Sequence, residues 1–208
     1  YRIGITVTGL ATQLSWNSKA EGSSYFTLRA AVEKLLKRFG IDIYTLQCES
    51  LDCDLYADAI VFKQGAKEVL RMGVVAPAVR KKFDIKQDVY FAEIDFDQLV
   101  KMTKKSKIQF KELSKFPEVK RDLALLVDKS VSFSQLRSIA FATEKKLLKS
   151  VSLFDVYEGD KLPAGKKSYA LSFILEDKNQ TLTDKQIERT MVNLQTQLEQ
   201  KTGAEIRK

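Results

Sequence analysis

Three polar side chains in the second half of the sequence have the types and spacing to hold an unpaired nucleobase. Asp155 and Tyr157 alternate along a strand-like run and therefore point to the same face. Ser168 begins the next strand-like run and lies beside Tyr157 if the two strands pair. An outward tyrosine can stack on a base, a carboxylate can accept hydrogen bonds from its N–H groups, and a hydroxyl can do either.

The strand expected over residues 167–175 has one apolar and one small polar side. The apolar side, which must meet the core, consists of Tyr169, Leu171, Phe173 and Leu175. The side expected to face outward consists of Ser168, Ala170 and Ser172. In the strand expected over residues 150–157, Phe154 and Val156 suit the core side, and Leu153 then points outward.

Basic residues flank this proposed outward face. They are Lys120, Arg121, Lys161, Lys166 and Lys167. Contacts to phosphate would position a nucleic acid without reading its sequence. A structural interpretation stays open, because tyrosines are common in strands and lysines at strand ends are often only solvated.

The second half shows the periodicities of two helices and four strands. Strands are expected over residues 122–128, 150–157, 167–175 and 204–207. Ser132 and Thr183 each precede a glutamine by three residues, as in a capping box, and so open the two helices. The order β-α-β-β-α-β over residues 115–208 predicts a ferredoxin-like domain with helices on one face of its sheet.

The first hundred residues also alternate between strand and helix patterns. Strands are expected over residues 1–8 and 89–94, with a hairpin around 63–65. Residues 28–39 and 97–102 have helical spacing, a short helix starts at Pro77, and residues 15–24 read as a polar loop. A lysine-rich linker is expected over 101–114, which divides the chain into domains 1–100 and 115–208. The chain begins without Met inside a strand-like run, which indicates a segment of a longer polypeptide.

The amino-acid composition excludes several kinds of catalytic and metal-binding site. The 208 residues carry a net charge of +8 but no histidine, which excludes Ser–His and Cys–His catalysis. Two cysteines cannot complete a tetrahedral zinc site, and we expect neither a catalytic nor a metal-binding residue. No signal peptide, membrane span or phosphate-binding glycine loop is evident. Residues 1–100 hold 13 basic and 13 acidic side chains, so the whole excess lies later, which favours a polyanion partner there.

Four motifs of the second half occur in a familiar order. They are Phe116-Pro117 leading to Lys120-Arg121-Asp122, then Leu153-Phe154-Asp155-Val156-Tyr157, then Gly165-Lys166-Lys167-Ser168, then Thr181-Leu182-Thr183-Asp184. This run resembles the ferredoxin-fold anticodon-binding domain that closes the β subunit of bacterial phenylalanyl-tRNA synthetase. The resemblance implies that the first anticodon base stacks on Tyr157, with Asp155 and Ser168 contacting bases. Where the family has Arg-Arg-Asp, this chain has Lys120, which keeps the charge but loses the bidentate fork that Arg121 retains.

The first half resembles the same β subunit. The motifs that carry the resemblance are Gly73-Val74-Val75-Ala76-Pro77 before a basic helix, and the strand Val89–Asp95. In the family this region ends a synthetase-like core without an active site of its own. The expected fold is therefore α+β: a truncated class II synthetase-like antiparallel sheet domain, followed by the ferredoxin-like domain.

The resemblance implies a tRNA(Phe)-binding region of a cytoplasmic heterotetrameric ligase. Its α subunit would catalyse aminoacylation with ATP and Mg²⁺, while this chain would hold no cofactor. The implied partners are tRNA(Phe), the α subunit and a second β subunit, with no role for DNA or a membrane. Two alternatives stay open: a ferredoxin-like module that binds a regulatory amino acid, and a first domain that serves only as a subunit interface.

Overall fold

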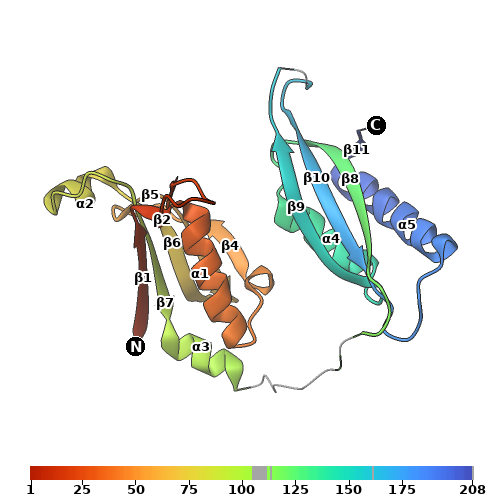
Figure 1. The fold of residues 1–208 in the computed structure, drawn as a ribbon, viewed down its shortest axis with the longest axis horizontal. Coiled ribbons are helices and arrows are strands. Elements are labelled where there is room, and N and C mark those ends of the chain that lie inside the picture. The colour runs from red at the N-terminus through yellow and green to blue at the C-terminus, as the bar shows by residue number, and fades with distance from the viewer. Residues whose placement is uncertain (105–111, 113, 161, 208) are drawn as a thin grey trace. The chain divides into compact units, whose positions relative to one another are not determined.

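A computed structural model describes residues 1–104, 112, 114–160 and 162–207. The chain divides into two compact units, Tyr1–Phe110 and Lys111–Lys208 (Figure 1). Each unit has its own antiparallel sheet and its own hydrophobic core. Most of the linker expected over 101–114 lies outside the described residues, and its first three residues belong to a helix.

The first unit is built on a five-stranded sheet with the order β1-β7-β6-β5-β4. Its strands are β1 (Arg2–Thr8), β4 (Gln47–Ser50), β5 (Tyr56–Gln64), β6 (Lys67–Val75) and β7 (Val89–Asp95). Its helices are α1 (Tyr25–Arg38), η1 (Ile43–Thr45), α2 (Pro77–Lys82) and α3 (Phe96–Thr103). Two short strands, β2 (Leu10–Thr12) and β3 (Glu21–Gly22), pair with each other; β3 lies within residues 15–24, which the sequence suggested were a polar loop, and β2 precedes them.

Helix α1 lies on one face of this sheet and supplies much of its core. Ser24 opens the helix with a capping box, and Leu28, Val32 and Leu36 on its inner stripe are fully buried. They meet the side of the sheet that carries Leu70, Met72, Ala92 and Ile94. The apolar residues that recur with helical spacing in α1 and those that alternate along β6 and β7 therefore form one hydrophobic core.

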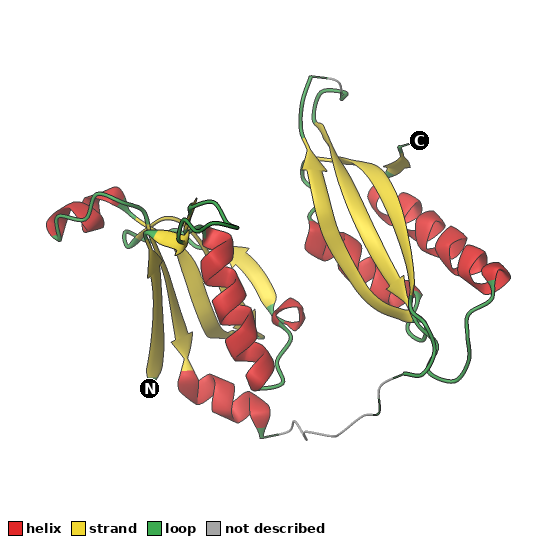
Figure 2. Cartoon of the chain, viewed as in Figure 1, coloured by secondary structure: helices red, strands yellow, loops and turns green. Residues whose placement is uncertain are grey.

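The second unit has the element order that the sequence predicted. Its strands are β8 (Val119–Asp128), β9 (Leu148–Tyr157), β10 (Lys166–Leu175) and β11 (Glu205–Ile206), and its helices are α4 (Phe133–Thr143) and α5 (Asp184–Thr202). The strands pair in the order β11-β8-β10-β9, which is the split β-α-β-β-α-β arrangement. Figure 2 shows both helices on the same side of this sheet.

Local signals begin and end the two helices of this unit. The Ser132 hydroxyl accepts from the Gln135 N–H, and at Thr183 the Gln186 side chain also returns the bond. Gly203 follows α5 with φ of 65°, a left-handed conformation that releases the chain into β11. The helices cover Leu125, Leu171, Phe173 and Leu175, all fully buried, as the strand parity predicted.

The outward side of β9 differs from the prediction at one point. Ala170 pairs with Asp155 and Leu171 pairs with Leu153, so Phe154 is an extra residue in a β-bulge. The bulge reverses the expected parity: Leu153 packs against the core, and Phe154 is 59% exposed. Asp155 and Tyr157 lie beyond the bulge and keep the side that the sequence predicted.

Gly73 is a position where the first unit tolerates no side chain. A Cβ there would lie 2.2 Å from the Asp58 carbonyl oxygen and 2.6 Å from the Ala59 Cβ. We expect Gly73→Ala to force β5 and β6 apart and to destabilise this unit by about 1–3 kcal/mol. Hydrogen exchange measured by mass spectrometry should show protection lost in β5 and β6 but kept in β8 and β10.

The matched control is Gly22→Ala, because a Cβ at Gly22 meets nothing within 4 Å. Equal protection of β5 and β6 in the two variants would contradict the close packing described for Gly73.

Candidate nucleic-acid interface

The second sheet carries no helix on one face among the residues that the structure describes (Figures 1 and 2). Strand register defines which side chains stand on this open face. Reading across β10, its rows pair Ser168 with Tyr157 and Leu126, Ala170 with Asp155 and Ala124, and Ser172 with Ser152 and Asp122. In these three rows the residues of β10 are small, so longer side chains of the neighbouring strands rise above them.

The register brings Tyr157, Asp155 and Ser168 together on the open face. Tyr157 is directly opposite Ser168, and Asp155 is one row further along β9. Tyr157 is 36% exposed and Asp155 is exposed, whereas Ser168 is only 6% exposed. An aromatic ring, a carboxylate and a hydroxyl thus share one patch, which can stack on a base and hydrogen-bond to its edge.

Arg207 completes this patch, and sequence reasoning did not identify it. Its backbone N–H donates to the Ala124 carbonyl oxygen at 2.9 Å, which continues the β11–β8 pairing by one residue. Its guanidinium carbon lies 5.7 Å from the centroid of the Tyr157 ring. Because β11 and β9 are opposite edges of the sheet, this cation–aromatic contact crosses β8 and β10, which accounts for the burial of Ser168.

Gly159 leaves room for the Tyr157 ring. A Cβ on Gly159 would lie 2.7 Å from the Tyr157 hydroxyl oxygen and 2.8 Å from the ring carbon that carries it. The turn after β9 therefore lies against the Tyr157 ring, and only a residue without a side chain at position 159 allows the ring to lie there. The sequence suggested only a loop at Gly159, because this contact depends on a rotamer.

Two of the basic residues expected to flank the face do lie beside it. Lys166 is on the open face, in register with Asp128, and its ammonium donates to Glu205 at 2.6 Å. This hydrogen bond raises the pKa of Lys166, so its charge persists throughout the neutral range. Lys120 is in register with Ile174 and lies 3.8 Å from the Asp122 carboxylate.

Lys167 and Arg121 are on the side of the sheet that faces the helices. Lys167 is 8% exposed, its ammonium donates to the Lys129 carbonyl oxygen at 2.8 Å and lies 4.6 Å from the Tyr169 ring. It therefore fastens the turn after β8 to β10. Arg121 is in register with the buried Phe173, and its guanidinium donates to the Lys120 carbonyl oxygen. Lys161 lies outside the described residues.

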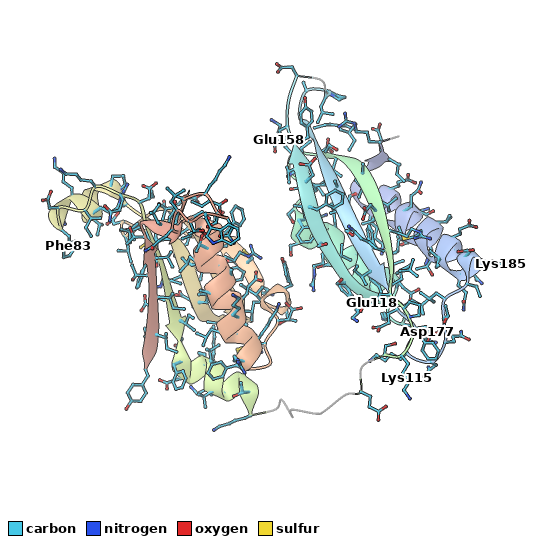
Figure 3. The ribbon with its side chains drawn as sticks, viewed as in Figure 1. Phe83, Lys115, Glu118, Glu158, Asp177 and Lys185 are labelled. Atoms are coloured by element: carbon cyan, nitrogen blue, oxygen red, sulfur yellow. The ribbon has the colours of Figure 1, made fainter. Side chains whose placement is uncertain are left out.

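Ion pairs close the two ends of this sheet. Lys149 bonds both Glu118, where β8 begins, and Glu176, beyond β10. Lys129 lies 3.5 Å from Glu158 at the far end of β9. Figure 3 labels Glu118 and Glu158 at these two ends. Acidic side chains at both ends are thus paired with lysines, as Glu205 is with Lys166 and Asp122 is with Lys120 on the open face.

The described residues contain no group of three His, Cys, Asp or Glu side chains arranged to hold a metal ion. Cys48 and Cys53 are free thiols. None of the helices that the structure describes is long and apolar enough to cross a membrane.

Comparison with protein families matches both units. Residues 114–207 match the ferredoxin-fold anticodon-binding domain. Residues 1–96 match the CLM domain of the phenylalanyl-tRNA synthetase β chain. The match over residues 1–96 falls within the first compact unit, and the match over residues 114–207 falls within the second.

Curated relatives match the whole chain. It is 48% identical over 208 residues to the phenylalanine–tRNA ligase β subunit of Bacteroides fragilis, covering 100% of this chain and 25% of that protein. The β subunit of Porphyromonas gingivalis is 48% identical over 207 residues, which is 99% of this chain and 25% of that protein. That of Syntrophotalea carbinolica is 34% identical over 208 residues, 100% of this chain and 26% of that protein. The chain thus spans about a quarter of the length of these relatives.

The position of the Tyr157 ring can be tested through Gly159. Gly159→Ala should displace the ring from its contact with Arg207, because the new methyl group would lie only 2.7 Å from the Tyr157 hydroxyl oxygen. NMR spectra of the variant should show changed ring-proton shifts for Tyr157 and unchanged shifts for the core Tyr169. Ring-proton shifts of Tyr157 that match the unmodified chain would contradict this geometry.

Proposed function

Because the chain belongs to the family of phenylalanine–tRNA ligase β subunits, we propose that its second unit binds the anticodon loop of tRNA(Phe). The helix-free face of its sheet is the binding surface. The observation that carries this proposal is the meeting of Tyr157, Asp155 and Ser168 in two adjacent rows of that face.

The chemistry of the patch suits an unpaired base. The Tyr157 ring offers a stacking surface, and such stacking contributes about 1–3 kcal/mol per base. Asp155 can accept from an exocyclic amine or a ring N–H, and Ser168 can donate or accept. Single-stranded loops expose these edges, whereas paired helices hide them. A base must displace Arg207 from above Tyr157, or insert beside it, before Ser168 becomes accessible.

Cations on the open face supply the contacts to phosphate. We assign this role to Lys166, Lys120 and Arg207, whose side chains stand on the face or at its edge. Arg121 contacts phosphate near the start of β8. Its register places it on the helix side of the sheet, but its side chain is exposed there. Lys167 has a structural role instead, because its ammonium is buried against a carbonyl oxygen and an aromatic ring. These phosphate contacts make binding depend on salt concentration.

The first unit serves as a scaffold in the assembled enzyme. We assign aminoacylation, with its ATP and Mg²⁺, to the α subunit of a cytoplasmic heterotetramer that also contains a second β subunit. Within that assembly the role of this chain is to position the tRNA. A regulatory module for a free amino acid is not favoured, because the family matched by residues 114–207 is an anticodon-binding domain.

Replacing the stacking surface tests this function. Tyr157→Ala should weaken binding of tRNA(Phe) to the 208-residue chain by about 1–3 kcal/mol, as measured by fluorescence anisotropy at fixed salt. Tyr157→Phe keeps the ring and should retain most of the affinity. Tyr1→Ala, which removes an exposed tyrosine from the other unit, is the matched control. If a folded Tyr157→Ala chain binds tRNA(Phe) with unchanged affinity, the proposed anticodon-binding function is wrong.

A further inference from the structure

A second cluster of polar and aromatic side chains lies on the same open face. It consists of Phe154, Lys120, Asp122 and Ser172, and we call it the second cluster. Ser172 is in register with Asp122 on β8, and Lys120 is in the next row, opposite Ile174. The pair Ala124 and Ala170 separates this cluster from the patch of Tyr157 and Ser168.

Phe154 is exposed because of the β-bulge in β9. An uninterrupted strand would place it with Val156 on the core side, but the bulge turns it to the face that carries Lys120. The Lys120 ammonium lies 5.7 Å from the centroid of the Phe154 ring. Bulges interrupt a ladder of hydrogen bonds and often re-aim a side chain near a functional site. Here the result is a large aromatic surface left to solvent.

Ser172 is a buried hydroxyl without a partner. It is 3% exposed, and no described residue forms a hydrogen bond with its Oγ. Burying an unsatisfied hydroxyl is costly, so such a group needs an explanation. Lys120 reaches from β8 to Phe154 on β9 and therefore crosses β10 close to Ser172. The hydroxyl therefore lies close to the contact between the Lys120 and Phe154 side chains.

The second cluster repeats the composition of the first patch. Tyr157, Arg207, Asp155 and Ser168 are an aromatic ring, a cation, a carboxylate and a covered hydroxyl. Phe154, Lys120, Asp122 and Ser172 are the same four kinds of group, and both cation–ring distances are 5.7 Å. The floor between them is two alanines, which leaves space above the sheet.

We propose that the second cluster holds a second unpaired base of the same RNA loop. This inference rests on the proposed function and extends it from one base to two. The base stacks on Phe154 where Lys120 lies in the free chain. Displaced from the ring, Lys120 is free to contact the neighbouring phosphate. Asp122 accepts from an N–H group on the edge of the base, and Ser172 gains the hydrogen-bond partner that it lacks.

The spacing of the two aromatic rings restricts how the RNA lies. Phe154 and Tyr157 are three residues apart on β9, which corresponds to about 10 Å along a strand. Stacked bases are separated by about 3.4 Å, so the two rings hold bases that are not stacked on each other. The face thus selects a loop whose bases are splayed apart, as proteins that read single-stranded RNA require.

The test pairs protein variants with RNA in which single bases are deleted. The probe is the anticodon stem-loop of tRNA(Phe), intact or with one loop base at a time replaced by an abasic site. Binding to the unmodified chain, Phe154→Ala and Tyr157→Ala is measured by fluorescence anisotropy. We expect Phe154→Ala to weaken binding of the intact loop about 5-fold or more. At one loop position, an abasic site that weakens binding to the unmodified chain should no longer weaken binding to Phe154→Ala. At a different loop position, the same should hold for Tyr157→Ala.

Matched variants control for folding and for loss of any exposed phenylalanine. Phe83→Ala removes a phenylalanine that is 73% exposed in the first unit (Figure 3) and should leave binding unchanged. Phe154→Tyr retains a ring and should keep affinity. Phe154→Leu keeps apolar bulk without a stacking surface and should bind as weakly as Phe154→Ala, which covers the case where the alanine variant does not fold.

Three outcomes would overturn the inference. If only Tyr157→Ala weakens binding, the second base site is absent while the anticodon function stands. If the same abasic position ceases to weaken binding in both Phe154→Ala and Tyr157→Ala, the face holds one base. If neither variant changes binding of the stem-loop, the proposed function itself fails.

Discussion

The constraint on which the open face depends is the two-sided character of the central strand β10. Its odd-numbered residues from Tyr169 to Leu175 are buried beneath α4 and α5. Its even-numbered residues from Ser168 to Ser172 are too small to form a second apolar layer. A helix on that side would have little surface to bury, so the face stays without one. The outer strands then supply the side chains that stand above the small-residue floor.

Two cation–aromatic contacts organise this face in the free chain. Arg207 with Tyr157, and Lys120 with Phe154, each reach across the sheet above a serine. Such contacts at exposed sites are worth about 0.5–1 kcal/mol, less than stacking on a base contributes. A base can therefore replace the cation on the ring, and the released cation remains close enough to meet the phosphate. Under the proposed function, the buried Ser172 hydroxyl, which has no hydrogen-bond partner among the described residues, would gain one when RNA binds.

Most of the second unit could be predicted from the sequence because its signals are local. Ser132 and Thr183 marked the helix starts, and alternation along β10 identified the core side without knowledge of its partners. Phe154 could not be assigned in this way, because a bulge depends on how β9 pairs rather than on its own residues. The position of Lys167 could not be predicted for a related reason: its ammonium donates to the Lys129 carbonyl oxygen, which only the folded chain brings beside β10. Arg207 could have been found by applying the parity argument to the strand expected over residues 204–207.

Mapping the RNA contact by NMR tests the central claim most directly. Amide shifts of the isotope-labelled 208-residue chain would be followed while the anticodon stem-loop of tRNA(Phe) is added. Binding on the helix-free face should shift the signals of β8, β9 and β10 around Ala124, Asp155 and Ser168. It should leave the solvent-facing residues of α4 and α5, such as Val192, unchanged. Shifts concentrated on these helices, or on the first unit, would contradict the account.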